Sequence, residues 1–252
     1  MEPRRIAGAA GLGMAIALAA AGAVRAEPFL LSSSGIWTGA VPADLATLGG
    51  IGTNEITFGE PVDTRPSAYR FEGTTVGPIT EMELLGGTFP IGDFIHENFP
   101  INLPSTASAT LQVTLNIDDL GNGSTTQVFT FQFLHNETPN FPPGGTCPDT
   151  GLATADFPAG CPDVVTLDNA FSQQSVVING VERFLQIVGF IDGEGELVDR
   201  FVTRENQENL ATLLVRFVQP VSEPAPMAVL GAGLALLGWR YSRPRNRGAR
   251  RR

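Results

Sequence analysis

The stretch from residue 111 to residue 134, LQVTLNIDDLGNGSTTQVFTFQFL, decides the fold of this 252-residue chain. In residues 111–117 apolar and polar side chains alternate, and in residues 128–134 phenylalanine occupies every second position. Alternation at period two is typical of a strand with one buried face. Between the two runs lies Asn122-Gly123, a pair that readily adopts the positive φ angles of a tight hairpin turn. We therefore predict a β-hairpin here.

The same pattern recurs towards the C-terminus. Residues 175–178 lead into Asn179-Gly180, and residues 181–191 return as the second strand of another predicted hairpin. Further strands are expected at 55–58, 69–72, 82–85, 164–167, 197–203 and 210–218. Many short strands divided by glycine and proline, without a clear amphipathic helix, predict an all-β antiparallel sandwich of the jelly-roll or immunoglobulin-like kind. A Rossmann or barrel enzyme is disfavoured because helices do not alternate with the strands.

The chain has two cysteines, Cys147 and Cys161, which flank a segment rich in proline and glycine. We expect them to form a disulfide, which by the chain-entropy estimate would contribute about 3 kcal/mol to stability. The spacing, with no histidine nearby, argues against a zinc site at these cysteines.

The N-terminus has the pattern of a signal peptide. Arg4 and Arg5 precede an apolar run over residues 6–24, and small residues follow, so cleavage is expected after Ala26. The alternative is an N-terminal membrane anchor. Residues 1–26 are thus predicted to be removed on export by the Sec route, with signal peptidase as the processing enzyme.

The C-terminus has an apolar segment over residues 226–239, followed by seven arginines. This run is shorter than the about 20 residues that span a bilayer comfortably, so we predict a marginal transmembrane helix. Its arginines would stay in the cytoplasm, leaving the domain outside. The alternatives are an ordinary C-terminal anchor or a basic nucleic-acid arm.

Charge separates the domain from its tail. Residues 27–222 contain 24 acidic residues against six arginines, an excess of 18 negative charges, and the chain has no lysine. Such a domain would be repelled by nucleic acid and by anionic lipid. We therefore predict no nucleic-acid partner, and membrane contact through the C-terminal helix alone. The predicted division is residues 1–26, a β domain over 27–221, and a sorting segment over 222–252.

Residues 222–226, SEPAP, followed by the apolar helix and the arginine cluster, resemble a PEP-CTERM sorting signal. Glu223 and Pro224 match the last two residues of the Pro-Glu-Pro hallmark, while Ser222 stands in place of its first proline. The resemblance implies processing by an exosortase in a Gram-negative envelope, transient membrane anchoring, and release to the cell surface or outside, often near exopolysaccharide.

The only two histidines lie in two similar motifs, residues 94–101 (FIHENFPI) and 133–140 (FLHNETPN). Together they resemble the THxN family of PEP-CTERM proteins, also described as a choice-of-anchor K domain, over most of residues 35–220. His96 and Asn98 match the family motif, whereas Ile95 replaces its threonine. Residues 201–205 (FVTRE) with Asn209 also look like a family feature. The resemblance implies no catalytic activity.

Two interpretations of these motifs stay open. His135 continues the apolar face of its strand, so it fits a hydrogen-bonded core histidine. Alternatively, the side chains of both motifs converge into one polar site for a metal or a sugar, which Glu97 or Glu137 could join. The candidate residues of that site are His96, Asn98, His135 and Asn136.

A weaker candidate site is the acidic run DGEGE at residues 192–196. Asp192, Glu194 and Glu196 could supply oxygen ligands to calcium, but the EF-hand spacing is absent and a solvated hairpin turn is the favoured interpretation. The sequence indicates no cofactor other than a possible calcium ion at this run.

Motifs of enzymes are absent from the sequence: it has no G-x-S-x-G, no H-E-x-x-H and no phosphate-binding glycine loop. We therefore expect a non-catalytic protein of the cell surface or extracellular matrix, with extracellular polysaccharide as a candidate partner. The alternative is a secreted carbohydrate-active hydrolase using two carboxylates, or a module that binds calcium or glycan.

Overall fold

The computed structural model describes residues 28–45, 47–102, 105–121, 123–138, 140, 144–168 and 170–220. The predicted signal peptide with Ala26, and the sorting segment with Glu223, Pro224 and the 226–239 helix, lie outside the described residues. Within the described ranges, no helix is long and apolar enough to cross a membrane.

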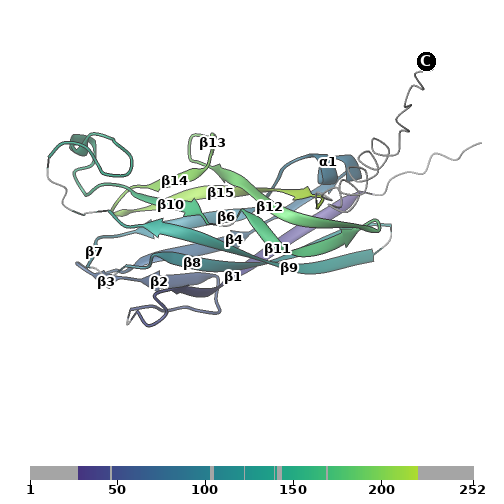
Figure 1. Cartoon of the computed structure of the whole chain (residues 1–252), viewed down its shortest axis with the longest axis horizontal. Helices are drawn as coiled ribbons and strands as arrows, with labels where there is room; N and C mark the ends of the chain where they lie inside the picture. Colours follow the sequence, from purple (N-terminus) through teal and green to yellow (C-terminus); the bar gives the residue numbers. More distant parts are fainter. Residues whose placement is uncertain are drawn as a thin grey trace, which may run out of the picture.

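Two antiparallel sheets form the domain, and their strands run along its long axis in two layers (Figure 1). The first sheet has the order β14 (Arg200–Thr203), β10 (Asp163–Leu167), β9 (Gly123–Asn136), β8 (Ser108–Asp119), β1 (Phe29–Val41) and β5 (Thr75–Ile79). The second has the order β11 (Phe171–Ile178), β12 (Val181–Ile191), β15 (Gln207–Val218), β6 (Phe89–Asn98), β4 (Ser67–Gly73) and β2 (Glu55–Phe58), with β13 (Leu197–Val198) paired to β12. The prediction of an all-β, antiparallel, sandwich-like fold is confirmed.

Two small elements mark the ends of the sandwich. The two-stranded ribbon of β3 (Glu60–Pro61) and β7 (Ile101–Asn102) lies at one end, and the helix α1 (Glu81–Gly86) lies at the other (Figure 1). A short 3-10 helix, η1 (Thr154–Asp156), interrupts the long connection between β9 and β10.

Both predicted hairpins are present. Strand β8 pairs with β9 along its whole length, from Ser108 opposite Leu134 to Asp119 opposite Gly123. Strands β11 and β12 meet at Ile178 and Val181. Their two-residue turn has positive φ at both positions, 51° at Asn179 and 76° at Gly180, as an Asn-Gly hairpin requires.

Aromatic side chains from both sheets fill the space between them. Phe94 on β6 packs against Phe133 on β9 with ring centroids 4.9 Å apart, and Trp37 on β1 packs against Tyr69 on β4 at 5.5 Å. All four side chains are fully buried. The alternation that predicted the strands therefore also defines the buried face of each sheet.

The prediction of a strand at residues 82–85 is wrong, because these residues lie in α1. Thr80 and Glu83 form a reciprocal capping box: Glu83 Oε2 accepts from the Thr80 backbone N–H at 2.7 Å, and Thr80 Oγ1 accepts from the Glu83 N–H at 3.3 Å. This pairing stabilises the first turn of a helix. Buried Leu84 anchors the helix to the core.

Strand β1 was not predicted, because a run of three serines and a glycine hides its alternation. The Ser33 hydroxyl donates to the carbonyl oxygen of Ile91 in the opposite sheet. Gly35 lies so close to Phe71 that a Cβ there would come within 2.5 Å of its ring. Small side chains are therefore accommodated where the two layers approach closely.

The predicted disulfide is present: Cys147 and Cys161 are bonded with their Cα atoms 5.5 Å apart, and both side chains are buried. It closes a loop within the β9–β10 connection. At the same connection, Thr138 Oγ1 donates to the Cys161 carbonyl at 2.6 Å, which ties the disulfide loop to the end of β9.

Gly92 in β6 provides a test of the packing between strands. Its φ is 145°, and an added Cβ would lie 2.4 Å from the Glu72 carbonyl oxygen. We expect Gly92→Ala to lower the free energy of unfolding by about 2–4 kcal/mol through backbone strain and overpacking. Gly39 in β1 is the matched control, because a Cβ there meets nothing within 4 Å. Urea unfolding of both variants checks this, and equal stability of the two would contradict it.

Candidate functional site

The two histidines meet inside the sandwich at the end that carries β3 and β7. His96 lies near the end of β6 in the second sheet, and His135 lies near the end of β9 in the first. Their ring centroids are 5.4 Å apart, and their exposed fractions are 0% and 7%. Each histidine follows a core phenylalanine by two residues, so strand alternation turns both rings inwards.

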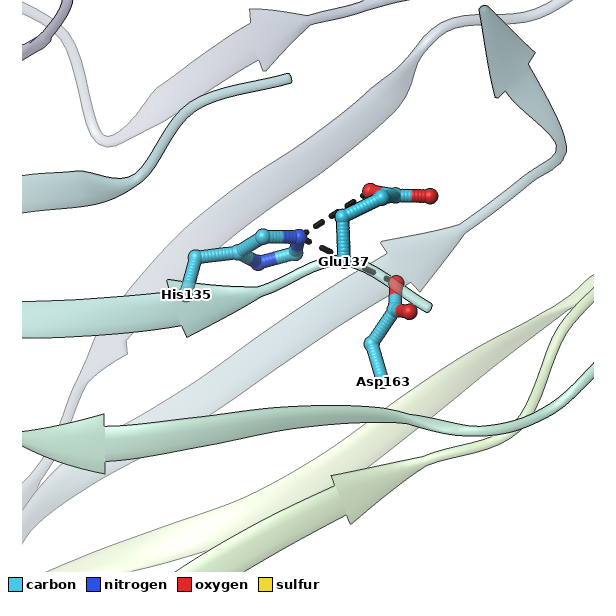
Figure 2. Close-up of side chains that lie close together, drawn as sticks. All are labelled: His135, Glu137 and Asp163. Carbon is cyan, nitrogen blue, oxygen red and sulfur yellow. Dashed lines mark hydrogen bonds and ion pairs between the residues drawn. The ribbon is translucent and has the colours of Figure 1, made fainter. Parts of the chain in front are cut away.

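Carboxylates surround His135. Its Nε2 lies 3.1 Å from Oε2 of Glu137 and 3.8 Å from Oδ2 of Asp163 (Figure 2). Glu137 follows the end of β9, and Asp163 begins β10, the strand paired with it. A third carboxylate, on Glu205, is only 5% exposed and interacts electrostatically with both. We call His96, Asn98, His135, Glu137, Asp163 and Glu205 the buried polar cluster.

Neighbouring groups hold the side chains of His135, Glu137 and Asp163 in place. Asp163 Oδ1 accepts the backbone N–H of Thr138 at 2.7 Å, and Glu137 Oε2 accepts the Ser105 hydroxyl at 3.1 Å. The Tyr69 hydroxyl is hydrogen-bonded to His135 Nδ1. Three separate elements therefore fix the orientation of these groups.

Thr203 on β14 organises the opposite side of the buried polar cluster. Its Oγ1 is hydrogen-bonded to His96 Nδ1 at 2.8 Å, and its carbonyl accepts the Asn98 side-chain N–H at 3.1 Å. Strand β14 belongs to the first sheet and β6 to the second, so Thr203 bridges the two layers.

Burial shifts the titration of these groups. The pKa of Asp163 is raised well above its usual value, first by burial and then by Glu137 and Glu205. Burial and Glu137 raise the pKa of Glu205 to about 8. Burial and His135 lower the pKa of His96, so its imidazole stays neutral. Tyr69 keeps its proton, because burial and the nearby carboxylates raise its pKa.

Several polar atoms of the buried polar cluster lack a hydrogen-bond partner among the described residues. These atoms are His96 Nε2, Asn98 Oδ1, Glu137 Oε1, Asp163 Oδ2 and both carboxylate oxygens of Glu205. The Asn98 amide lies near enough to Glu205 to lower its pKa slightly, but not in hydrogen-bonding geometry. An unpartnered buried polar group costs about 1–3 kcal/mol. Protons on the carboxyl groups or a bound cation would therefore stabilise the site.

Positive charge from side chains is scarce here. The chain has no lysine, and in the described ranges no arginine forms an ion pair with Glu137, Asp163 or Glu205. Chemically, the arrangement can share protons among its carboxyl groups or bind a metal ion. Among the described residues its side chains are buried, so they offer no open approach for a large substrate.

Other predicted site residues lie elsewhere. Asn136 is exposed, because it follows His135 by one residue and points to the other face of β9. Glu97 likewise points away from His96 and pairs with Arg70 at 2.7 Å. Of the predicted residues, the structure brings together His96, Asn98, His135 and Glu137.

The calcium candidates form a hydrogen-bonded turn. One oxygen of Asp192, Oδ1, accepts the backbone N–H groups of Glu194 at 2.9 Å and Glu196 at 3.0 Å. Both glutamates are exposed. This geometry supports the interpretation as a solvated turn between β12 and β13.

Sequence reasoning did not single out Asp163 or Tyr69. Asp163 opens a short apolar strand 26 positions after Glu137, and only tertiary structure brings the two together. Glu205 lies within the 201–205 motif that the family resemblance includes, so that motif was an available signal for Glu205. For Asp163, the available signal was its position as a polar residue on the inward face of strand β10.

The stability of the metal-free protein should depend on pH through Glu205. Its pKa rises from 4.5 to about 8 on folding. Such a group stabilises the fold fully below its unfolded pKa, and that stability is lost as pH rises through the folded pKa. The groups that face it are Glu137, Asp163 and Asn98. Above its ordinary pKa of 6.5, His96 is neutral in both states, so it does not interfere.

In EDTA, we therefore expect the melting temperature to fall between about pH 6.5 and pH 8. Glu205→Gln should reduce that fall, whereas Glu194→Gln on the exposed turn should keep it. Calorimetry across this range tests the idea, and a flat wild-type profile would count against it.

Comparison with known proteins adds no relative: neither a protein-family model nor a curated protein matches this chain. The resemblance to THxN and PEP-CTERM proteins stays a prediction from the quoted residues. Any assignment of function therefore depends on the geometry of the domain and on the pattern of its sequence.

Proposed function

We propose that this chain is an exported, non-catalytic protein of the outer surface or extracellular matrix of a Gram-negative bacterium. In this proposal the Sec route exports it, signal peptidase removes residues 1–26, and an exosortase processes the 222–252 segment. The domain is then delivered to an exopolysaccharide or biofilm setting. The membrane holds it only transiently, through the apolar helix at 226–239.

The observation that carries the proposal is the buried disulfide between Cys147 and Cys161, which leaves no free cysteine. Disulfides persist in oxidising compartments outside the cytosol. The apolar N-terminal run and the arginine-flanked C-terminal run are the pattern expected at the two ends of an exported, anchored chain.

Burial of the carboxylates supports a non-catalytic role. The side chains of Glu137 and Asp163 are 8% and 0% exposed. A glycosidase places its two carboxyl groups on either side of a bound sugar, in a cleft that the polymer can enter. These carboxylates are closed within the protein, so the hydrolase alternative finds no acid pair here.

A surface groove beside the buried polar cluster offers a place for a glycan. Apolar side chains, polar groups and carboxylates line it together: among them are Leu152, Phe157, Phe201, Arg204, Gln207, Asn209, Asp192, Glu194 and Glu208. The Arg204 guanidinium lies 5.6 Å from the centre of the Phe157 ring. Ligand sites commonly pair an apolar surface with a few polar groups that orient the ligand.

Processing can be tested by the intact mass of the protein recovered from the cell exterior. We expect the mature N-terminus to be Glu27, with the arginine-rich tail removed and the disulfide formed. Recovery of the full-length chain from the cytosol, with both thiols reduced, would refute the proposal.

Polysaccharide contact can be tested with exopolysaccharide purified from the producing organism. We expect binding without release of reducing sugar, and Phe157→Ala should weaken binding about tenfold, since an aromatic anchor contributes more than 1 kcal/mol. Val177→Ala, at an exposed position on β11, is the control. Steady release of reducing sugar would favour the hydrolase instead.

A further inference from the structure

We propose that the buried polar cluster binds one divalent transition-metal ion, of which Zn²⁺ fits best, through His135, Glu137 and Asp163. This inference goes beyond the proposed function, because it assigns a metal centre to the interior of the domain. The ion would join β9 to β10 at the end of the sandwich where the two histidines meet.

The distances suit a metal ion. One ligand atom from each of the three residues can be chosen so that all lie within 4.8 Å of one another (Figure 2). Zinc bonds of 2.0–2.2 Å in a tetrahedral arrangement place neighbouring ligand atoms about 3.4 Å apart. The distances from His135 Nε2 to Glu137 Oε2 and Asp163 Oδ2 are 3.1 Å and 3.8 Å, on either side of that value. Shifts of a few tenths of an ångström in the three side chains would bring these distances to the separation of zinc ligands.

An independent observation is the unpartnered oxygen of Asp163. The Asp163 side chain is 0% exposed, its Oδ1 is held by the Thr138 N–H, and its Oδ2 faces His135 Nε2 without a hydrogen bond. In Figure 2 the two carboxylates approach the same ring nitrogen. An ion between these three atoms would satisfy the lone pairs that the protein leaves unmatched.

The second sheet supplies further groups. Nε2 of His96 and Oδ1 of Asn98, on fully buried side chains, and both carboxylate oxygens of Glu205 have no hydrogen-bond partner in the part of the chain that the structure describes. The His96 ring stands edge-on to the His135 ring. These side chains lie around the three ligands and would line the coordination sphere from outside.

Charge favours a divalent cation. Three carboxyl groups share an interior in which no arginine among the described residues forms an ion pair with them, and both imidazoles of the chain lie beside them. Several like charges cannot remain ionised together in a site of low dielectric. A bound ion of charge +2 would let the carboxylates ionise and act as ligands.

Outer hydrogen bonds orient the three ligands. The Tyr69 hydroxyl meets His135 at Nδ1, the Ser105 hydroxyl meets Glu137, and the Thr138 N–H meets Asp163. In the tautomer whose proton is on Nδ1, that N–H donates a hydrogen bond to the Tyr69 oxygen, and Nε2 keeps the lone pair that a metal needs. Such partners fix the tautomer and geometry of metal ligands.

The ligand set distinguishes Zn²⁺ from Ca²⁺. Calcium takes six to eight oxygen ligands and has little use for imidazole. A histidine nitrogen with two carboxylate oxygens suits zinc and related transition metals. Both histidines of the chain lie in this cluster, so any coordination by imidazole must occur here.

Titration of the untagged, EDTA-treated full chain with ZnCl₂ tests the proposal, with MnCl₂ and CaCl₂ in parallel. We expect one Zn²⁺ per chain by calorimetry, a higher melting temperature, and shifted NMR signals of the two imidazoles. Weaker or no binding of Ca²⁺ is expected. Outer-shell losses alone cost 10–100-fold, so Asp163→Asn, which removes a ligand, should weaken zinc binding by more than about 100-fold.

Controls separate the site from the rest of the acidic surface. Glu194→Gln removes an exposed carboxylate and should bind zinc like the wild type. Glu137→Gln is the second ligand variant, in case Asp163→Asn does not fold. Because neutralising a buried carboxylate removes repulsion, a ligand variant should keep its metal-free melting temperature and lose the zinc-dependent rise.

Two results would overturn the proposal. In the first, millimolar ZnCl₂ and MnCl₂ leave the melting temperature and the imidazole signals of the wild type unchanged. In the second, the ligand variants bind zinc as the wild type does, which would place the ion elsewhere. Neither result depends on export or on polysaccharide contact, so this test is separate from those of the proposed function.

Discussion

The packing of Phe94 against Phe133 is the contact on which the rest of the domain depends. It joins β6 of one sheet to β9 of the other at the centre of the aromatic core, with ring centroids 4.9 Å apart. Because side chains alternate along a strand, the residue two positions after each phenylalanine points into the same interior. His96 and His135 must face each other across the interior, and a shift of one residue in either strand would turn its histidine to the surface.

Local patterns predicted those parts of the fold that local forces determine. Both hairpins and most strands follow from alternation, and the structure confirms them. The Asn-Gly turn itself is confirmed at Asn179-Gly180, whereas Asn122 of the first hairpin lies outside the described residues. The helix at 81–86 was not predicted, because the capping box that stabilises its first turn is formed by the polar residues Thr80 and Glu83, which an apolar pattern does not include. Strand β1 was not predicted, because the two sheets approach closely there and only small residues such as serine and glycine fit, so the strand lacks an alternating pattern. Asp163 joins the histidines only through pairing of distant strands, which one sequence cannot reveal.

The acidic residues of this chain serve two different environments. At the surface, Arg70 interacts with Glu55, Glu72, Glu97 and Glu208, so one cation offsets several exposed carboxylates in water. In the interior, Glu137, Asp163 and Glu205 have no such partner among the described residues. An ionised carboxylate therefore costs little free energy on the solvent side of a strand, and much more on the buried side unless it gains a partner. This contrast, rather than net charge, distinguishes the interior cluster.

The Cys147–Cys161 bridge lies within the connection that carries Glu137 at its start and Asp163 at its end. Thr138 binds both the Cys161 carbonyl and the Asp163 carboxylate, so the oxidised loop and the two acids are mechanically linked. A newly made chain in a reducing cytosol would lack this clamp. The arrangement of the two acids is therefore linked to the redox state of Cys147 and Cys161, because reduction of the bridge would free the loop that joins them.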